Sequence, residues 1–289
     1  MMFTGEALAH ENFAITIHDI ALLNSLGVRL VLAYGARPQI EQQCTAHNVP
    51  LNYHDNLRIT DARSLKIATA VIGKLRLEIE AKLSFSLPHT PMADSQIRCV
   101  SGNLITAQPV GIKDGIDLGS TGQVRHVDTL GITQQLELGN IVLLPPLGYS
   151  PTGEIFNLSA RDVAAEVAIA LQADKLILIA DHYPDLPYEL TVDQAQSALA
   201  AYPTTLKSVT DACSAGVQRV HLLDREMDGA LLQELFSRDG AGTLVSAGSF
   251  ETIRQATIDD VCGILELIQP LEDNGTLVKR SREHLEIEI

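Results

Sequence analysis

The segment VRLVLAYGARP, residues 28–38, carries the clearest sign of the fold. Its first six residues are mainly aliphatic, as in a buried strand, and Gly35 ends the run just before a helix that we expect to begin at Pro38. A glycine at such a strand-to-helix turn lets a ligand approach the N–H groups of the helix N-terminus, which suits phosphate. Taken alone, however, one glycine at this position is more often a plain turn than a binding loop.

Helical patterns and short aliphatic runs alternate on both sides of this segment. We expect a very short strand at residues 1–4, helices over residues 10–26, 38–47, 62–83, 158–172, 203–215 and 229–236, and strands over residues 96–106, 123–128, 141–144, 175–179 and 218–223. Strands that alternate with helices form parallel βαβ units, with helices on both faces of the sheet. The sequence therefore predicts an α/β fold with a mainly parallel central sheet.

The composition excludes several classes of protein. The chain has 289 residues, of which 46% are hydrophobic and 20% charged, as in an ordinary globular protein. A net charge of −15 argues against nucleic acid and membrane surfaces as partners. The cysteines, Cys44, Cys99, Cys213 and Cys262, are at least 49 residues apart, which predicts neither a metal site nor a redox pair. The apolar runs are too short to cross a membrane, and no Lys or Arg precedes Arg29, so we expect a cytoplasmic protein without a signal peptide.

The sequence pattern changes after Val245. Residues 246–249 are a plausible linker, followed by an expected strand over residues 253–257 and a helix over residues 260–271 that Asp259 would cap. The residues beyond the linker are too few to fold alone without a disulfide or a metal. We therefore expect one domain over residues 1–247, with an incomplete N-terminus, and the beginning of a second over residues 248–289.

A series of motifs occurs in the order found in the amino acid kinase family, and the chain most closely resembles the N-acetylglutamate synthases over about residues 3–289. These motifs are Thr4-Gly5-Glu6, Asn56-Leu57-Arg58-Ile59-Thr60-Asp61, Ser101-Gly102-Asn103, residues 145–158, residues 228–236 and residues 240–243. The resemblance implies an αβα sandwich of the carbamate kinase-like type over residues 1–247 and the start of a GNAT acetyltransferase domain over residues 248–289. It also implies the family's reaction, acetyl transfer from acetyl-CoA to the α-amino group of L-glutamate, the first step of arginine biosynthesis.

The departures from the kinase pattern favour a synthase over a kinase. N-acetylglutamate kinases carry a Lys where this chain has Met2, three glycines where it has Gly35-Ala36-Arg37, and an Asp where it has Arg161. Phosphoryl transfer depends on positioned cations around the phosphate, so these changes should abolish it.

The resemblance therefore implies a vestigial kinase pocket, formed by Gly5, Gly35, Ala36, Arg37, Arg58, Asn157 and Arg161. In kinase relatives the residue matching Arg58 holds a substrate carboxylate. In a vestigial site the alternative is that Arg58 only caps a loop or pairs with a carboxylate of the chain.

The part of a GNAT domain that binds coenzyme A is absent from the sequence. Its pyrophosphate loop, Arg/Gln-x-x-Gly-x-Gly/Ala, occurs nowhere in the chain. We expect no bound cofactor and no transferase activity from this chain alone, with acetyl-CoA as the family's cosubstrate. The resemblance also implies a homodimer, because the helix through which arginine-sensitive members form hexamers would precede Met1.

Three residues match the arginine-binding pattern of arginine-sensitive members, a His followed by a Glu after thirteen residues and a Gly after six more. They are His221, Glu234 and Gly240. A carboxylate can pair with a guanidinium bidentately, and a glycine lets the backbone approach a ligand. The alternative is a satisfied core histidine, a helix-surface glutamate and a loop glycine. Besides the arginine-inhibited enzyme, two functions stay open: an arginine-binding regulatory module without activity, and an ATP-dependent N-acetylglutamate kinase.

Overall fold

The computed structural model describes residues 1–84, 97–181, 183–237 and 240–246, together with residues 257, 261, 263–265, 268 and 269. The chain divides into two compact units, Met1–Gly248 and Ser249–Ile289. The strand predicted over residues 253–257 lies almost wholly outside the described residues, whereas the described residues of 260–271 are helical. No helix in the described part of the chain is both long enough and apolar enough to span a membrane.

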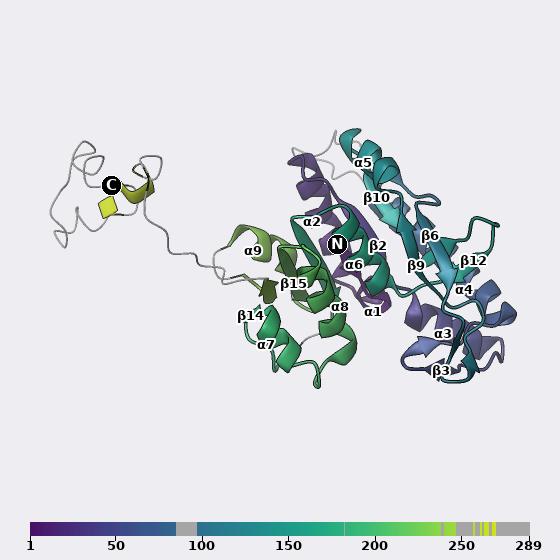
Figure 1. Ribbon diagram of the computed structural model, residues 1–289. Helices are drawn as coiled ribbons and strands as arrows, with labels where there is room; N and C mark the ends of the chain where they lie inside the picture. The colour runs from purple at the N-terminus through teal and green to yellow at the C-terminus, as the bar shows by residue number, and fades with distance from the viewer. Residues whose placement is uncertain are drawn as a thin grey trace. The chain divides into compact units, whose positions relative to one another are not determined.

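An eight-stranded sheet forms the centre of the first unit (Figure 1). Its strands lie in the order β14 (Glu189–Thr191), β16 (Thr243–Ser246), β15 (Arg219–Asp224), β13 (Lys175–Ala180), β1 (Met2–Phe3), β2 (Val31–Tyr34), β10 (Ile141–Leu144) and β5 (Cys99–Val100). All neighbours are parallel except β15 and β16. The two-residue strand β1 thus lies near the middle, between β13 and β2, which leaves the loops after β1 and β2 side by side.

Helices cover both faces of this sheet, because alternate residues of each strand point to opposite sides. In β13, Leu176 and Leu178 join one core cluster, whereas Ile177 and Ile179 join the other. The first cluster includes residues of α5 (Thr129–Glu137), α6 (Ala160–Ala170), α7 (Val192–Ser197) and α8 (Pro203–Ser214). The second includes residues of α1 (Gly5–Ala9), α2 (Phe13–Ser25), α3 (Arg37–Ala46), α4 (Ala62–Leu83) and α9 (Ala230–Phe236). The predicted α/β sandwich with a mainly parallel sheet is confirmed.

A second, four-stranded sheet and two hairpins were not predicted. The sheet has the order β12 (Ile155–Asn157), β11 (Leu147–Tyr149), β6 (Ile105–Pro109) and β9 (Gly122–Val127). The hairpins are β3 (Tyr53–His54) with β4 (Leu57–Arg58) and β7 (Ile112–Lys113) with β8 (Ile116–Asp117). The single strand predicted over residues 96–106 is wrong: β5 joins the central sheet and β6 the smaller one, with non-strand residues 101–104 between them.

Most predicted helices are present with small changes at their ends. The helix predicted over residues 10–26 begins at Phe13, because a separate short helix, α1, ends at Ala9. The Thr4 hydroxyl starts α1 by accepting a hydrogen bond from the Ala7 amide at 3.2 Å. The helix α4 has the predicted bounds, and the Asp61 carboxylate caps it by accepting from the Ser64 amide at 2.7 Å.

Candidate functional site

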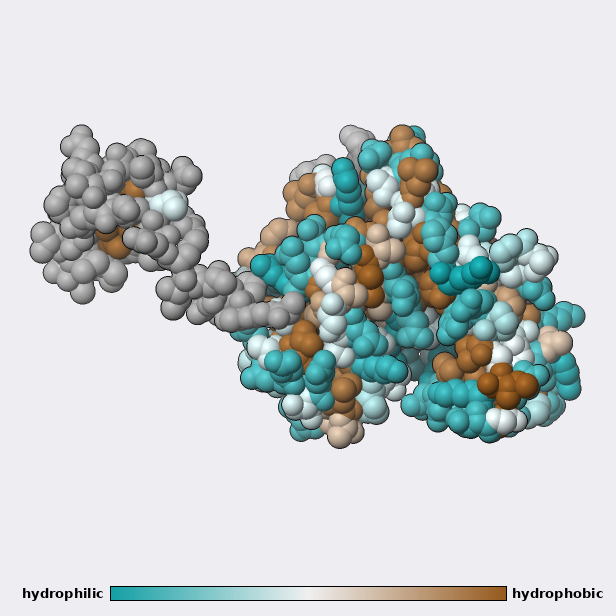
Figure 2. Space-filling view, in the orientation of Figure 1, coloured by the Kyte–Doolittle hydropathy of each residue, from teal (hydrophilic) through white to brown (hydrophobic). Residues whose placement is uncertain are grey.

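A cavity of about 360 Å³ lies at the ends of β1 and β2. All seven residues of the predicted vestigial pocket line it: Gly5, Gly35, Ala36, Arg37, Arg58, Asn157 and Arg161. Seen from one face, the surface is hollowed between the part that carries α8 and the part that carries α3 and β3 (Figure 2). The structure thus brings together residues that are as far as 156 positions apart in the sequence.

The two glycines of this cavity serve the packing of the chain. A Cβ atom on Gly35 would lie 2.9 Å from the backbone nitrogen of Gly5, and a Cβ atom on Gly5 would lie 2.5 Å from Cδ of Pro38. The Gly35 amide also donates to the Phe3 carbonyl oxygen at 2.7 Å. The loops after β1 and β2 can therefore approach each other only without side chains, so these glycines alone do not indicate a phosphate loop.

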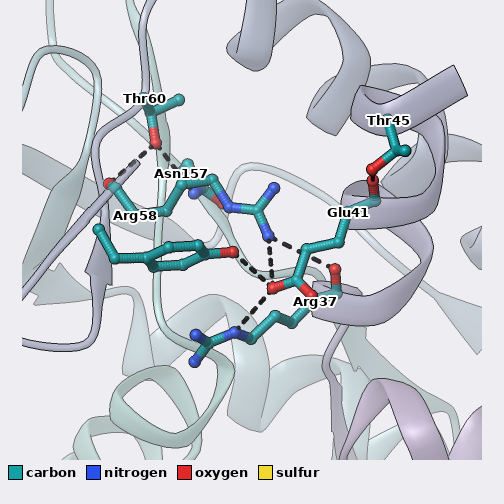
Figure 3. Close-up of polar contacts among 7 residues, drawn as sticks. Arg37, Glu41, Thr45, Arg58, Thr60 and Asn157 are labelled. Carbon is teal, nitrogen blue, oxygen red and sulfur yellow. Dashed lines mark hydrogen bonds and ion pairs between the residues drawn. The ribbon is translucent and has the colours of Figure 1, made fainter. Parts of the chain in front are cut away.

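The Glu41 carboxylate contacts two arginines and a tyrosine on the α3 side of the cavity (Figure 3). Oε1 of Glu41 accepts from the Tyr53 hydroxyl at 2.5 Å, from Nε of Arg37 at 3.0 Å and from Nη2 of Arg58 at 3.4 Å. The guanidinium carbon of Arg37 also lies 4.7 Å from the centre of the Tyr53 ring. Burial favours a higher pKa for Glu41, but the hydrogen bonds from Tyr53 and Arg37 hold that pKa below its usual range.

Arg58 is anchored at its backbone. Its carbonyl oxygen accepts hydrogen bonds from the hydroxyls of Thr60, at 3.3 Å, and Thr121. The Thr60 hydroxyl in turn accepts from Nδ2 of Asn157 at 3.2 Å, so β4 and β12 are held together under the cavity (Figure 3). The side chain of Arg58 is only 7% exposed, and its Nη1 atom is buried without a hydrogen-bond partner among the described residues.

Arg161 and Met2, which the motif resemblance aligns with catalytic positions of kinases, both line this cavity. Arg161 lies in the first turn of α6, whose N-cap Ser159 accepts from the Asp162 amide at 3.3 Å. Its Nε atom is also buried without a partner in the part of the chain described. Met2 is 1% exposed and adds an uncharged side chain to the cavity wall. Desolvation raises the pKa of Asp162, and the hydrogen bond from Ser159 and the charge of Arg161 partly offset this effect.

The three residues of the predicted arginine site lie together around β15, which is two strands away from β1 in the central sheet. His221 lies on β15, Glu234 on α9 and Gly240 in the loop before β16. Nδ1 of His221 lies 2.5 Å from Oε1 of Glu234, and both side chains are 5% exposed. The side chain of Glu234 therefore does not extend into solvent as a helix-surface glutamate would.

Glu234 is also bound by the loop that follows its helix. Its Oε2 atom accepts from the backbone amides of Ala241 at 2.6 Å and Gly242 at 3.0 Å. Burial favours a higher pKa for Glu234, but the hydrogen bonds from His221 and these amides hold the pKa below its usual range. With three donors on one carboxylate, a bidentate pair with a guanidinium would require one of these bonds to open.

Gly240 lies beside the Glu234 carboxylate, and its backbone has a conformation that favours glycine. Its φ angle is +67°, and a Cβ atom there would lie 2.8 Å from Oε2 of Glu234. His221 keeps one nitrogen free, because its Nε2 atom is buried and has no partner within the described chain. Among the described residues the His221 ring is therefore hydrogen-bonded at Nδ1 and not at Nε2.

Comparison with known proteins decides the family. Residues 1–183 match the model of the amino acid kinase family. The amino-acid acetyltransferase of Ectopseudomonas mendocina is 49% identical over 300 residues, an alignment that covers the whole chain and 69% of that protein. The chain belongs to the amino-acid acetyltransferase family. A second member, from Azotobacter vinelandii, is 50% identical over 300 residues with the same coverage.

Solved structures agree with membership of the amino-acid acetyltransferase family. The N-acetylglutamate synthase of Neisseria gonorrhoeae, complexed with coenzyme A and L-arginine, matches 99% of this chain and 68% of its own with a TM-score of 0.88 and 38% identity. The same synthase with coenzyme A and N-acetyl-glutamate matches with a TM-score of 0.78. A carbamate kinase of Giardia lamblia, only 10% identical, shares the fold with a TM-score of 0.60. The resemblance found in the sequence is confirmed.

Several residues of the site were not predicted. Glu41 lies four residues after Arg37, a spacing at which opposite charges pair on a helix, so the sequence itself could have indicated this contact. Tyr53 and Thr121 reach the site only through the hairpin and the smaller sheet, and no local pattern indicates them. At the edge of the cavity, which Asp55 lines, His54, Asp55 and Asp114 hold potential metal ligands within 4.8 Å of one another. Nζ of Lys113 lies 2.7 Å from Oδ2 of Asp55 and already supplies a positive charge there.

Proposed function

We propose that this protein takes part in the acetylation of L-glutamate by acetyl-CoA, the first step of arginine biosynthesis, and that L-arginine inhibits it by binding to the unit Met1–Gly248. In that reaction the α-amino nitrogen attacks the thioester carbonyl, an amide bond forms, and the coenzyme A thiol leaves. Membership of the acetyltransferase family supports the reaction. We assign none of its steps to the described residues.

The observation that carries the regulatory part is the buried His221–Glu234 pair. A buried polar atom without a partner costs about 1–3 kcal/mol, so the Nε2 atom of His221, which has none among the described residues, favours a polar ligand beside it. Oε1 of Glu234 accepts one hydrogen bond among the described residues and keeps capacity for one more. A guanidinium or amino group of arginine could use that capacity, while the loop at Gly240 brings the backbone close.

The kinase alternative is less well supported. No lysine of the described residues lines the cavity, and Met2 and Arg161 stand where kinase relatives have a cation and a carboxylate. Phosphoryl transfer depends on groups placed to stabilise the charge of the moving phosphoryl group, and two such groups of the kinase pattern are replaced here. We therefore propose that the cavity does not transfer phosphate. That the protein is a homodimer in the cytoplasm stays a prediction, and light scattering on the purified protein tests the dimer.

Two measurements on the purified chain separate the remaining functions. Thiol release from acetyl-CoA in the presence of L-glutamate reports acetyl transfer, and isothermal titration reports L-arginine binding. Transfer that L-arginine suppresses supports the enzyme with feedback inhibition. L-Arginine binding without thiol release supports the regulatory module. Absence of L-arginine binding, with a folded protein by circular dichroism, contradicts the arginine site.

A further inference from the structure

Asp19, on the helix α2, is a buried carboxylate without a partner. It is only 8% exposed, and it forms no hydrogen bond or ion pair with any residue that the structure describes. It lines a small cavity between α2, the end of β15 and the start of α9. Moving a carboxylate out of water is costly unless the group takes up a proton or an opposite charge lies beside it. Asp19 therefore requires either a proton or a cation in this cavity.

The cavity beside Asp19 has the size and the lining that suit a single cation. Its volume is about 10 Å³, near the lower limit for holding one water molecule. Two further aspartates line it, Asp224 at the end of β15 and Asp228 just before α9. Oδ1 of Asp224 already accepts from the Glu226 amide at 2.8 Å. We propose that a hard divalent cation, Mg²⁺ or Ca²⁺, binds in this cavity between the carboxylates of Asp19 and Asp228.

The positive groups near this cavity do not compensate the charge of Asp19. The guanidinium group of Arg225, which also lines the cavity, pairs with Asp181. His18 is exposed and only partly opposes two larger effects, burial and repulsion from Asp228, which together raise the pKa of Asp19 to about 6. At neutral pH Asp19 is therefore mostly charged, in the interior of the protein and close to a second carboxylate.

The ligand atoms available in this cavity are mainly oxygens. Besides the aspartates, the lining provides the Thr16 hydroxyl and the side-chain oxygen of Asn12, whose Nδ2 atom donates to the Glu226 carbonyl oxygen at 2.8 Å. Oxygen ligands suit Mg²⁺ and Ca²⁺, whereas imidazole and thiolate groups suit zinc and copper. No histidine or cysteine of the described residues lines the cavity. A divalent charge also balances the two carboxylates of Asp19 and Asp228.

A cation at this position would join α2 to the loop that precedes α9. The hydrogen bond from Asn12 to Glu226 already links the start of α2 to that loop. The expected consequence is therefore a more stable packing of α2 against the loop, which thermal melting measures. Glu234 does not line the cavity, so this proposal does not depend on the arginine site.

The test uses magnesium chloride and calcium chloride as separate probes on the full chain, freed of metal with EDTA. Thermal melting and isothermal titration at pH 8 are compared with sodium chloride at equal ionic strength. We expect at least one divalent cation to raise the melting temperature above the sodium chloride reference and to bind with measurable affinity. In Asp19→Asn the dissociation constant should rise about tenfold to a hundredfold, because one charged contact is lost. Asp228→Asn should also weaken binding, for the same reason.

The matched control is Asp114→Asn, which alters the other group of potential metal ligands, at the exposed turn between β7 and β8. This variant should respond to the cation as the wild type does. A response to one of the two salts identifies which cation the site prefers. The proposal is overturned if neither salt acts beyond sodium chloride, or if Asp19→Asn binds as tightly as the wild type. Loss of the response in Asp114→Asn alone would place the cation at the hairpins and would also overturn it.

Discussion

Nδ1 of His221 lies 2.5 Å from Oε1 of Glu234, and this contact joins the strand β15 to the helix α9. The other oxygen of Glu234 accepts the amides of Ala241 and Gly242 and so fixes the loop that leads into β16. One buried carboxylate therefore connects a strand, a helix and a loop. Nε2 of His221 has no hydrogen-bond partner in the described part of the chain, so a ligand bound to it would contact β15 next to this connection.

Replacing Glu234 should weaken L-arginine binding. Glu234→Ala removes three hydrogen bonds, two of which hold the loop at residues 241–242. A charge-assisted hydrogen bond contributes about 1.5–3 kcal/mol, so the dissociation constant should rise by about one to two decades. Glu234→Gln should be nearly as damaging, because its NH2 group cannot accept from a backbone amide. His221→Ala should cost less, since it removes one hydrogen bond to the Glu234 carboxylate and leaves the two that hold the loop.

Isothermal titration measures this series, with Glu166→Ala, an exposed residue of α6, as the matched control. Circular dichroism establishes that each variant is folded. If the wild type and Glu234→Ala bind L-arginine equally well, the arginine site is elsewhere.

Gly240→Ala should lower the melting temperature of the protein more than Gly153→Ala, the same substitution in another loop. Both Gly240 and Gly153 have positive φ angles, +67° and +88°. A Cβ atom at residue 240 would lie 2.8 Å from Oε2 of Glu234, whereas nothing lies within 4 Å of one at residue 153. Gly153→Ala therefore carries only the backbone strain, about 1–2 kcal/mol. Thermal melting should rank Gly240→Ala below Gly153→Ala, and equal melting temperatures would show that the contact with Glu234 is unimportant.

The central sheet could be predicted because its strands are short aliphatic runs separated by helices, and each run is a local feature. The hairpins were missed although one had a local signal. Asp114 and Gly115, both with positive φ, form the Asp-Gly turn typical of a two-residue hairpin. Asp55 and Asn56 also adopt positive φ, 47° and 62°, in the turn between β3 and β4. This second turn lacks glycine, so its signal in the sequence is weaker.

The site was predictable where residue spacing or family motifs reveal it. The spacing of His221, Glu234 and Gly240 indicated three residues that the structure brings together. Their order could not show that backbone amides already occupy Glu234, because those bonds depend on how the loop folds back. Likewise, the contact of Tyr53 with Glu41 requires the β3–β4 hairpin to lie against α3, which no local pattern encodes.

The protein should not phosphorylate N-acetylglutamate with ATP. Met2 is buried and uncharged in the cavity wall, and Arg161 replaces the carboxylate that organises catalytic lysines in kinase relatives. A coupled assay for ADP, with an active N-acetylglutamate kinase as the positive control, should give no signal above the rate without substrate. ADP formation that depends on N-acetylglutamate would falsify this prediction.

Asp19 should make stability depend on pH. This carboxylate of α2 is buried beside a small cavity that Asp228 also lines. Burial, followed by repulsion from Asp228, raises the pKa of Asp19 from its ordinary value of 3.8 to about 6, against a smaller opposing effect of His18. The folded protein therefore binds more protons at this residue than the unfolded chain between about pH 4 and 6. The contribution of Asp19 to the free energy of unfolding must then fall as the pH rises through that window.

Asp19→Asn removes this penalty and should raise the melting temperature at pH 8, where Asp19 is charged in both states. The difference between the two pKa values corresponds to about 3 kcal/mol, which partial access of solvent reduces to about 1–2 kcal/mol. At pH 4 the folded protein holds Asp19 protonated, so the advantage of the variant should largely disappear. Asp174→Asn, at an exposed residue, is the control and should show no such trend. Melting curves at pH 4, 6 and 8 test this prediction. An equal gain in melting temperature at all three pH values would mean that the charge of Asp19 does not cause the gain.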